Sequence, residues 1–591
     1  MAQKDKRKKN MNPQKEKLTG VLVDGRVFYV PFYQRAYVWN VKLWKRFIKD
    51  MEYVTVTPEE YFLGSIILKD KGAEGIETDR QEVIDGQQRL TTIAIFMKVL
   101  SLRDPSVHNL FDKKFRLDDG TLTIKHSLSD KDAFEKIANL TEDISLEGED
   151  DSNLIKAYNY FRANIDLTKI NINSIQARTV FICIHLDNNE NEHRIFDTIN
   201  SLAMKLNTEE LLKNHLFKES TFPSYNSIWK PVFEMDTNCL NYWKTEYSIG
   251  RNTKKTISEG FFYTLLQIIM HDPRNNVSSE EKKEFRRYDD ENLFEHYKKI
   301  ISSGNWDLIE FAKEITIYAN LYKQIFTKDI QTDSDACKTP LKRILLMVFA
   351  LDANTVLPYI LYILNNVSDT IEQNKIFELL ESYIVRRQIC RCNSNNYSDL
   401  FTENLIGQQI KSFNDLAKYL KDRNSSLYMP SDKEVKECFH TNNKLSSVKA
   451  RCILYLLESK LRAANPYQTA LHHFNQYSTE HLMPQNWIAN WTLPEGLDDM
   501  QKLEFTEERN RVINTLGNLA ILTQGLNSAI SDSEWEKKKN GTSRQSGLVK
   551  YASDLITLKD VVTKTEWNEN TIKERADWLA EKANSIWKSL D

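Results

Sequence analysis

The middle of the chain, from about residue 220 to residue 470, has the apolar spacing of α-helices almost throughout. Apolar residues recur three and four positions apart, which gives a helix one buried face. The segments with this pattern are Trp306–Phe326, Leu341–Leu351, Val356–Leu364, Ile376–Arg391 and Val448–Ala463. Because 591 residues are too many for one hydrophobic core, we predict a helical block between two regions of mixed structure.

The mixed regions are recognised by short β-like runs. In the first region these runs are Val21–Val23, Val27–Val30, Tyr61–Leu68, Glu82–Ile84 and Val180–His185. We expect an α+β multidomain protein. The domains that we predict are a basic flexible tail over residues 1–17, an α/β domain over 18–220, a helical linker or scaffold over 221–445, and a terminal domain over 446–591.

The composition indicates the cellular compartment of the protein and the classes of partner that its charge favours. The formal net charge is −3, so binding to a polyanion would depend on local basic patches. The seven cysteines are scattered and odd in number, which is typical of reduced thiols. No apolar run reaches the ~20 residues of a membrane span, and no hydrophobic segment follows the first lysines. We therefore expect a cytoplasmic protein with no membrane partner.

Four residues of the middle region could suggest a metal site, but their spacing argues against one. Cys390 and Cys392 are separated by one residue, with Cys438 and His440 downstream. The cysteine pairs of zinc sites have about two to four intervening residues. A zinc site here is therefore not expected.

The first region contains a junction that suits phosphate binding. The run Glu82–Ile84 is followed by Asp85-Gly86, a turn signal, and then by an apolar helical segment, Thr91–Leu100. The start of a helix offers free backbone N–H groups and a positive dipole end. Gly86 allows close backbone approach, and Arg89 can pair with phosphate oxygens. The candidate residues are Asp85, Gly86, Gln87, Gln88 and Arg89.

A second cluster of aromatic and polar residues lies between Pro31 and Trp39. Its candidate binding residues are Tyr33, Gln34 and Arg35. From physical reasoning alone, this segment is equally compatible with a binding loop and with the polar end of a core strand.

Near the end of the chain, several residues follow the order of parts in a metal-dependent nuclease. Glu480 precedes His481, Pro484 follows, Asn518 opens the short apolar run Leu519–Leu522, and Asn527 lies just beyond it. A carboxylate and an amide oxygen suit a hard cation, and a histidine can deprotonate water. Each residue taken singly is more typical of a structural role, whereas the set in this order favours a nuclease.

Both ends of the chain resemble the GmrSD family of modification-dependent restriction enzymes. Residues 470–545 are similar to its carboxy-terminal nuclease domain, an HNH variant with a ββα-metal fold. The resemblance implies that His481 is the general base, that Asn518 braces the histidine loop, and that Lys538 approaches a phosphate. It also implies that Glu480 and Asn527 contact a divalent cation, Mg²⁺ or Mn²⁺.

Residues 18–220 resemble the amino-terminal domain of the same family, which is similar to the ParB/sulfiredoxin fold. The matching segments are Tyr33–Trp39, Phe62–Ser65, Ile84–Thr91, Phe196–Ser201 and Leu211–Asn214. The resemblance implies binding and hydrolysis of a nucleoside triphosphate at the candidate residues named above and at Asn200. It also implies coupling to cleavage of DNA with modified bases or a modified backbone.

We therefore expect a nucleotide-regulated, metal-dependent endonuclease that restricts modified phage DNA as a double-stranded substrate, and that acts as a homodimer. One alternative is a nucleotide-dependent DNA-binding regulator with an inactive nuclease domain. Another is a self-targeting nuclease toxin. In the middle region, Arg386 and Arg387 are equally compatible with a solvated helix face and with a DNA-facing one.

Overall fold

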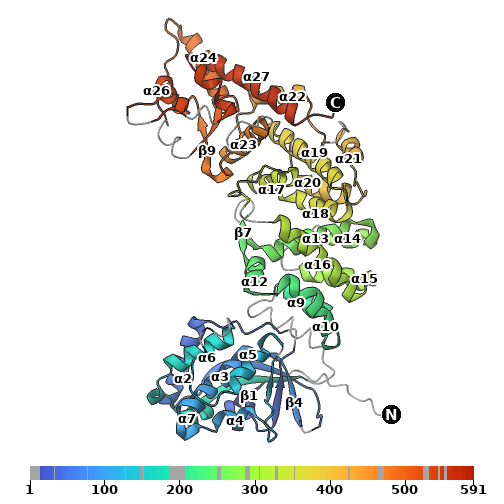
Figure 1. The fold of residues 1–591 in the computed structure, drawn as a ribbon, viewed down its shortest axis with the longest axis vertical. Helices are drawn as coiled ribbons and strands as arrows, with labels where there is room; N and C mark the ends of the chain where they lie inside the picture. Colours follow the sequence, from blue (N-terminus) through green and yellow to red (C-terminus); the bar gives the residue numbers. More distant parts are fainter. Residues whose placement is uncertain are drawn as a thin grey trace, which may run out of the picture. The chain divides into compact units, whose positions relative to one another are not determined.

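The computed structural model describes residues 13–590, apart from residues 32–33, 76, 127, 147, 149–151, 187–206, 249–253, 286–292, 305, 327–329, 352, 423–425, 464–470, 524–531, 544–545 and 551–554. The chain divides into two compact units, Met1–Pro223 and Ser224–Asp591. The first unit contains the blue elements of Figure 1 and the second contains the yellow and red ones. In the described part of the chain, no helix is both long and apolar enough to span a lipid bilayer.

The first unit contains a six-stranded mixed sheet in the order β1-β6-β3-β4-β2-β5. Strand β3 lies between β6, to which it is parallel, and β4, to which it is antiparallel. Strand β2 runs parallel to both β4 and β5. The strands are β1 (Pro13–Lys17), β2 (Arg26–Tyr29), β3 (Tyr61–Asp70), β4 (Asp79–Asp85), β5 (Ile124–Lys125) and β6 (Thr179–Leu186).

The strands confirm the β-like runs of the first region except Val21–Val23, because Leu18–Val21 forms the short helix α1 and no strand covers the described residues Val21–Val23. A second correction concerns the start of the chain. Residues 13–17 were expected in a flexible tail, but they form β1, which pairs antiparallel with β6. The sequence of β1, Pro-Gln-Lys-Glu-Lys, has no apolar residue and lies at the edge of the sheet. Charged residues on an edge strand discourage pairing with other chains, which explains why this strand shows no apolar pattern.

Helices cover the sheet of the first unit and supply most of its core. Helix α3 is buried along most of its length, and Leu90, Ala94 and Met97 are each at most 2% exposed. It packs with aromatic residues of neighbouring helices, including Phe47 and Phe161. The main helices are α2 (Val41–Val56), α3 (Gln87–Arg103), α5 (Leu128–Ala138), α6 (Asn153–Asn164), α7 (Ile172–Arg178) and α9 (Thr208–Leu216).

The second unit begins with a block of helices, as the apolar spacing predicted. The long helices start at capping residues, such as Thr256 before α13 and Asp307 before α16, whose side chains accept backbone N–H groups. The described helices of this block include α12 (Thr237–Lys244), α13 (Ile257–His271), α14 (Ser279–Phe285), α15 (Leu293–Ser303), α16 (Leu308–Ile325), α17 (Pro340–Ala350), α18 (Leu357–Asn366), α19 (Thr370–Ile389), α21 (Phe413–Leu420), α22 (Asp432–Thr441) and α23 (Ser447–Ala463).

The terminal part of the chain packs onto this block instead of standing apart from it. Helix α27 lies along α22 and contacts α23, and Figure 1 shows α27 beside α22. We expected a division at residue 445, but residues 224–591 group into one unit. The terminal elements are β9 (Tyr477–His481), α24 (Asp499–Val512), β10 (Leu519–Thr523), α26 (Trp535–Asn540) and α27 (Glu569–Ile586).

The two arginines of α19 are structural residues. Each is 1% exposed, so neither forms a solvated or DNA-facing surface. Arg386 donates to the backbone oxygen of Pro430 and pairs with Asp432. Arg387 donates to backbone oxygens of Tyr428 and Asn393. Guanidinium groups with several fixed partners tie α19 to the chain segments around it.

Candidate functional site

The carboxy-terminal candidate residues lie on and around a two-stranded antiparallel sheet. Strands β9 and β10 pair so that His481 lies opposite Leu519 and Glu480 lies opposite Ala520. Successive side chains of a strand point to opposite faces. Glu480 is only 8% exposed, whereas His481 is half-buried. The strand pair therefore separates the two neighbours, with the acid toward the interior and the histidine at the surface.

Asn518 holds the loop that follows His481. Its side chain is fully buried, and its amide oxygen accepts the backbone N–H of Met483 at 2.8 Å and the indole N–H of Trp567 at 2.9 Å. Its amide nitrogen donates to the backbone oxygens of Met483 and Ile513, both at 2.8 Å. An amide whose oxygen and nitrogen are both bonded fixes the position of the loop.

The imidazole of His481 is held by a residue that the sequence did not single out. Its Nε2 lies 3.0 Å from the side-chain oxygen of Asn514, which also accepts the amide of Gln485 at 2.7 Å. Burial lowers the pKa of His481, and the nearby Lys538 lowers it further against the hydrogen bond to Asn514. The imidazole is therefore neutral near pH 7, which is the form that accepts a proton.

Lys538 lies in a different place from the one we expected. We predicted that it would approach a phosphate, but its side chain is fully buried. Its ammonium donates to Glu480 Oε1 at 2.5 Å and to the backbone oxygen of His481 at 2.7 Å. A buried ammonium needs a paired carboxylate, and Glu480 supplies it.

Desolvation shifts the pKa values of both the carboxylate and the ammonium of this pair. Burial raises the pKa of Glu480, and the neighbouring Asp532 raises it too, while Lys538 opposes the shift. Burial lowers the pKa of Lys538, and Glu480 opposes that shift. The attraction between the two groups therefore opposes the effect of burial on both pKa values without overcoming it.

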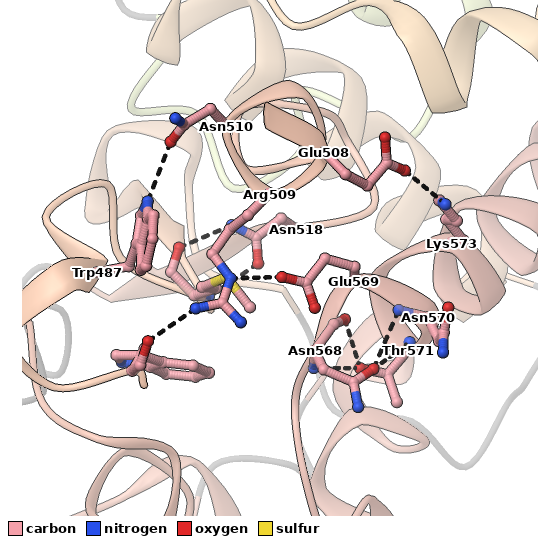
Figure 2. Close-up of polar contacts among 12 residues, drawn as sticks. Trp487, Glu508, Arg509, Asn510, Asn518, Asn568, Glu569, Asn570, Thr571 and Lys573 are labelled. Carbon is pink, nitrogen blue, oxygen red and sulfur yellow. Dashed lines mark hydrogen bonds and ion pairs between the residues drawn. The ribbon is translucent and has the colours of Figure 1, made fainter. Parts of the chain in front are cut away.

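Polar contacts join helices α24 and α27 near Asn518 (Figure 2). Arg509 of α24 pairs with Glu569 at the start of α27 and donates to the backbone oxygen of Trp491 at 2.7 Å. Asn568 caps α27 by accepting the backbone N–H groups of Asn570 and Thr571. These contacts join two helices that are distant in sequence.

Arg575 connects α27 to the turn that contains Asn518. Its Nη1 donates to the backbone oxygens of Leu516, Gly517 and Leu519, at 3.2, 2.8 and 2.8 Å. Burial lowers the pKa of Arg575 to about 9. Gly517 is required at this contact, because a Cβ there would lie 2.5 Å from the backbone oxygen of Ile572.

The amino-terminal candidate residues form a strand–turn–helix junction, as predicted. β4 ends at Asp85 and α3 begins at Gln87. Gly86 between them has φ +101°, a left-handed conformation that favours glycine. A Cβ at Gly86 would lie 3.0 Å from Ile66 Cγ1. The glycine is therefore required by the turn and by its packing on β3.

The segment around Gln34 lies against this junction. Gln34 donates its amide to the backbone oxygen of Ile84 at 2.8 Å. The side chain of Gln88 accepts the backbone N–H of Val38 at 2.9 Å and donates to the backbone oxygen of Ala36 at 3.2 Å. The two motifs, which lie about 50 residues apart, thus meet in one place. Arg35 is half-buried in the same segment.

Arg89 and Asp85 are partly open to solvent. The guanidinium of Arg89 donates to the backbone oxygen of Ser65 at 2.8 Å and lies 3.8 Å from Asp85 Oδ2. Their side chains are 30% and 36% exposed. Gly64 makes room for this arginine, since a Cβ there would lie 2.6 Å from Arg89 Nε. The guanidinium is thus positioned by backbone while part of it stays accessible.

Gln87, the first residue of α3, is an unusual feature of this junction. Its side chain is 3% exposed, and its amide oxygen and nitrogen have no hydrogen-bond partner among the described residues. A buried amide without partners costs about 1–3 kcal/mol. Such a group is explained most simply by a ligand or an ordered water.

Three predicted site residues, Tyr33, Asn200 and Asn527, lie outside the described residues. Conversely, the structure places four further residues at the carboxy-terminal site that sequence reasoning missed: Asn514, Asp532, Trp567 and Arg575. Trp567 and Arg575 are some 50 to 60 residues from their partners, so no local spacing marks them. Asn514 follows the last turn of α24 and resembles an ordinary helix end.

The chemistry of the donors bears on whether a cation fits this site. Lys538 is bonded to Oε1 of the Glu480 carboxylate, and Asp532 adds a second carboxylate in the neighbourhood. Carboxylate oxygens are ligands that Mg²⁺ and Mn²⁺ prefer. Within the described ranges, however, no group of three or more histidine, cysteine, aspartate or glutamate side chains is arranged to hold a metal ion. All seven cysteines are free.

Two family models match the chain. The model for the N-terminal domain of GmrSD restriction endonucleases matches residues 16–217, and the model for the C-terminal domain of GmrSD restriction endonucleases matches residues 429–582. The first match contains the Gly86 junction, and the second contains His481, Asn518 and most of α27. No curated protein matches the chain.

Proposed function

Because the chain belongs to the GmrSD family of restriction endonucleases that act on modified DNA, we propose that its second unit cuts DNA through an HNH-type site at His481 and that its first unit regulates cutting through a bound nucleoside triphosphate. The two domain models match opposite ends of the chain, which supports this division between the two functions.

The position of His481 carries the proposal. The imidazole is neutral, half-buried and fixed by Asn514, and the loop after it is held by Asn518. In the proposed reaction, His481 takes a proton from a water molecule as the water oxygen attacks the phosphorus of a phosphodiester. The bond from phosphorus to the 3′ oxygen breaks, and the leaving 3′ oxygen takes a proton from solvent. Fixing the base in advance removes much of the entropic cost of this step.

Glu480 and Asn527 would hold a divalent cation, Mg²⁺ or Mn²⁺. When bound, such an ion supplies stabilisation of the charge that develops on the phosphate oxygens. The charge of Lys538 lies beside the Glu480 carboxylate. We propose that Lys538 positions Glu480 through this pair and keeps it ionised. Its burial argues against a direct phosphate contact.

In the first unit, the triphosphate would bind at the Gly86 junction. Arg89 is positioned there with part of its guanidinium accessible, and the start of α3 provides a positive dipole end. The amide of Gln87 would find its missing partner in the bound nucleotide. Hydrolysis would then change the state of the second unit and so control cutting.

A cleavage assay on matched DNA tests the proposal. Modified and unmodified phage DNA would be incubated with the full chain, with Mg²⁺ or Mn²⁺, and with each nucleoside triphosphate or none. We expect cutting of modified DNA that requires the metal and responds to one nucleotide. Cutting that persists in EDTA would contradict the metal site, and cutting that is indifferent to every nucleotide would contradict the regulatory role.

The ion pair between Lys538 and Glu480 favours a second candidate function, a nucleotide-dependent DNA-binding regulator whose nuclease domain is inactive. A carboxylate already paired with an ammonium is less available to a cation. Nucleotide-dependent DNA binding without any cleavage, under all the conditions above, would support this alternative. Cleavage that is lost in His481→Ala would exclude it.

A further inference from the structure

The helical block of the second unit contains a cavity of about 270 Å³ that the nuclease site does not use. One face of α13 forms its floor, through Gly260, Thr264 and Gln267. These residues are four and three positions apart, so they point the same way from the helix. The walls come from the segment before α18, from the residues after α19, and from the hairpin of β7 (Glu246–Ser248) and β8 (Lys254–Thr256).

Gln267 is a polar side chain that a ligand in this cavity can reach. Its side chain is 6% exposed, and it lines the cavity. Its amide can donate through the nitrogen and accept through the oxygen. A molecule in the cavity with a donor and an acceptor would satisfy both ends of the amide.

The remaining polar groups of the cavity are uncharged with one exception. The hydroxyls of Thr264 and Thr402 donate to backbone oxygens of Gly260 and Ser398, both at 2.7 Å, and so keep oxygen lone pairs for an incoming donor. Lys255 is the one charged side chain among the described residues that line the cavity. A triphosphate, with about four negative charges, would require more cationic partners.

The cavity also offers an aromatic surface. Tyr263 lines it, and the ammonium of Lys255 lies 5.2 Å from the centre of that ring. Tyr247 approaches the floor closely, because a Cβ at Gly260 would lie 2.0 Å from the Tyr247 hydroxyl. Thr402 lies in η8 (Leu400–Asn404), a π-helix, and π-helical turns occur frequently at functional sites.

A neutral flat ring with donor and acceptor groups at its edge fits this set of side chains. Amides of glutamine and asparagine hydrogen-bond to the edges of nucleobases, and tyrosine rings stack on their faces. The volume lies near the lower limit of the ~300–1,000 Å³ typical of ligand pockets, which suits a single base and its adduct. Enzymes that act on DNA can rotate a base out of the duplex into such a pocket.

We propose that this cavity, called here the α13 pocket, receives a modified base rotated out of the DNA and reads its uncharged adduct through Gln267. This inference rests on the proposed action on modified DNA. The α13 pocket and His481 belong to the same compact unit, so the reading and the cutting of DNA would be functions of one unit.

Binding of short duplexes to the full chain tests the inference independently of cleavage. Fluorescence anisotropy in EDTA would compare an unmodified duplex with duplexes carrying one 5-methylcytosine, one 5-hydroxymethylcytosine or one glucosylated 5-hydroxymethylcytosine. Two variants address the pocket: Gln267→Leu, which removes the amide at similar volume, and Asn354→Ala, at an exposed rim residue where the fold is not at risk. The matched control is Gln324→Leu, at an exposed glutamine of α16.

We expect the wild-type chain to prefer one modified duplex and the two pocket variants to lose about tenfold of that preference, as for the loss of one good base contact. Affinity for the unmodified duplex and the melting temperature should not change, and Gln324→Leu should behave as wild type. Wild-type preference in both pocket variants would overturn the inference while leaving the proposed function intact. Absence of any preference in the wild-type chain would overturn it as well, and cutting of unmodified DNA would then contradict the proposed function separately.

Discussion

The loop around His481 and the turn at Gly86 satisfy their polar groups in different ways. In the loop, the buried amide of Asn518 bonds with backbone and indole groups through both its oxygen and its nitrogen. In the turn, the equally buried amide of Gln87 has no partner in the described part of the chain. A network in which every polar group has a hydrogen-bond partner fixes one geometry. A buried polar group without a partner can instead gain one from a bound ligand. The difference agrees with the roles proposed for the two places, a reacting site at His481 and a nucleotide-sensing site at Gly86.

The largest effect is expected at the fixed loop. His481→Ala should lower the cleavage rate by about 10²- to 10⁴-fold, because a general base contributes that much to a proton transfer. Gel assays of cleaved DNA and a thermal melt would be recorded together, and the melting temperature should stay unchanged. His472→Ala, at an exposed histidine nearby, is the control. Cleavage at the wild-type rate in His481→Ala would remove the residue from the reaction.

Asn518→Ala should affect stability as well as activity. It leaves the backbone N–H of Met483 and the indole N–H of Trp567 without an acceptor, which should cost about 3 kcal/mol of unfolding free energy. Urea unfolding curves, followed by a spectroscopic signal from the second unit, would measure this loss of unfolding free energy. Asn510→Ala is a matched control, because Asn510 also accepts an indole N–H, that of Trp487, but is exposed. Equal losses of unfolding free energy in Asn518→Ala and Asn510→Ala would contradict a special role for the hydrogen bonds of Asn518.

A buried carboxyl group, whose charge depends on pH, binds the segment beside the Gly86 turn. Asp130 accepts the backbone N–H of Tyr37 at 2.8 Å, and burial raises its pKa from 3.8 to about 6. The folded chain therefore binds a proton more readily than the unfolded chain, so this carboxyl reduces stability as pH rises from about 4 to 6.

Asp130→Asn should remove that loss and keep the hydrogen-bond acceptor. The variant should be more stable than wild type by about 1–3 kcal/mol at pH 7, and the gain should vanish near pH 4. Unfolding curves at several pH values would show it. Asp132→Asn, at an exposed residue of the same helix, should show no such pattern. A gain that is independent of pH would exclude ionisation as its cause.

The smallest effect on function is expected at the Gly86 turn, the proposed nucleotide site. Arg89→Ala should weaken nucleotide binding about tenfold, the loss of one charge-assisted contact. Calorimetric titration would measure it, with Arg46→Ala on α2 as the exposed control. Gly64→Ala provides a second route to the same result, because its Cβ would displace the Arg89 guanidinium. Unchanged binding in both variants would separate Arg89 from the nucleotide.

The sequence predicted the elements of both sites better than their contacts. The strand–Gly86–helix junction follows from local turn and helix signals, and the structure confirms it. The contact of Lys538 with a phosphate stays a prediction. Its burial against Glu480 was not foreseen, because that partner is 58 residues away and no local pattern indicates burial of the pair. The roles of His481, Glu480 and Arg89 stay predictions. Arg386 and Arg387 show the same limit, since two adjacent charges usually indicate solvent but here are buried.

The dependence of the Asn518 turn on α27 has a consequence during protein synthesis. Arg575 and Trp567 hold that turn, and both follow the whole nuclease motif in sequence. A nascent chain still missing its last helix has every proposed reacting residue but lacks Arg575, which holds the turn that contains Asn518. The ribosome must therefore synthesise and release α27 before Arg575 can set the geometry of the proposed reacting residues.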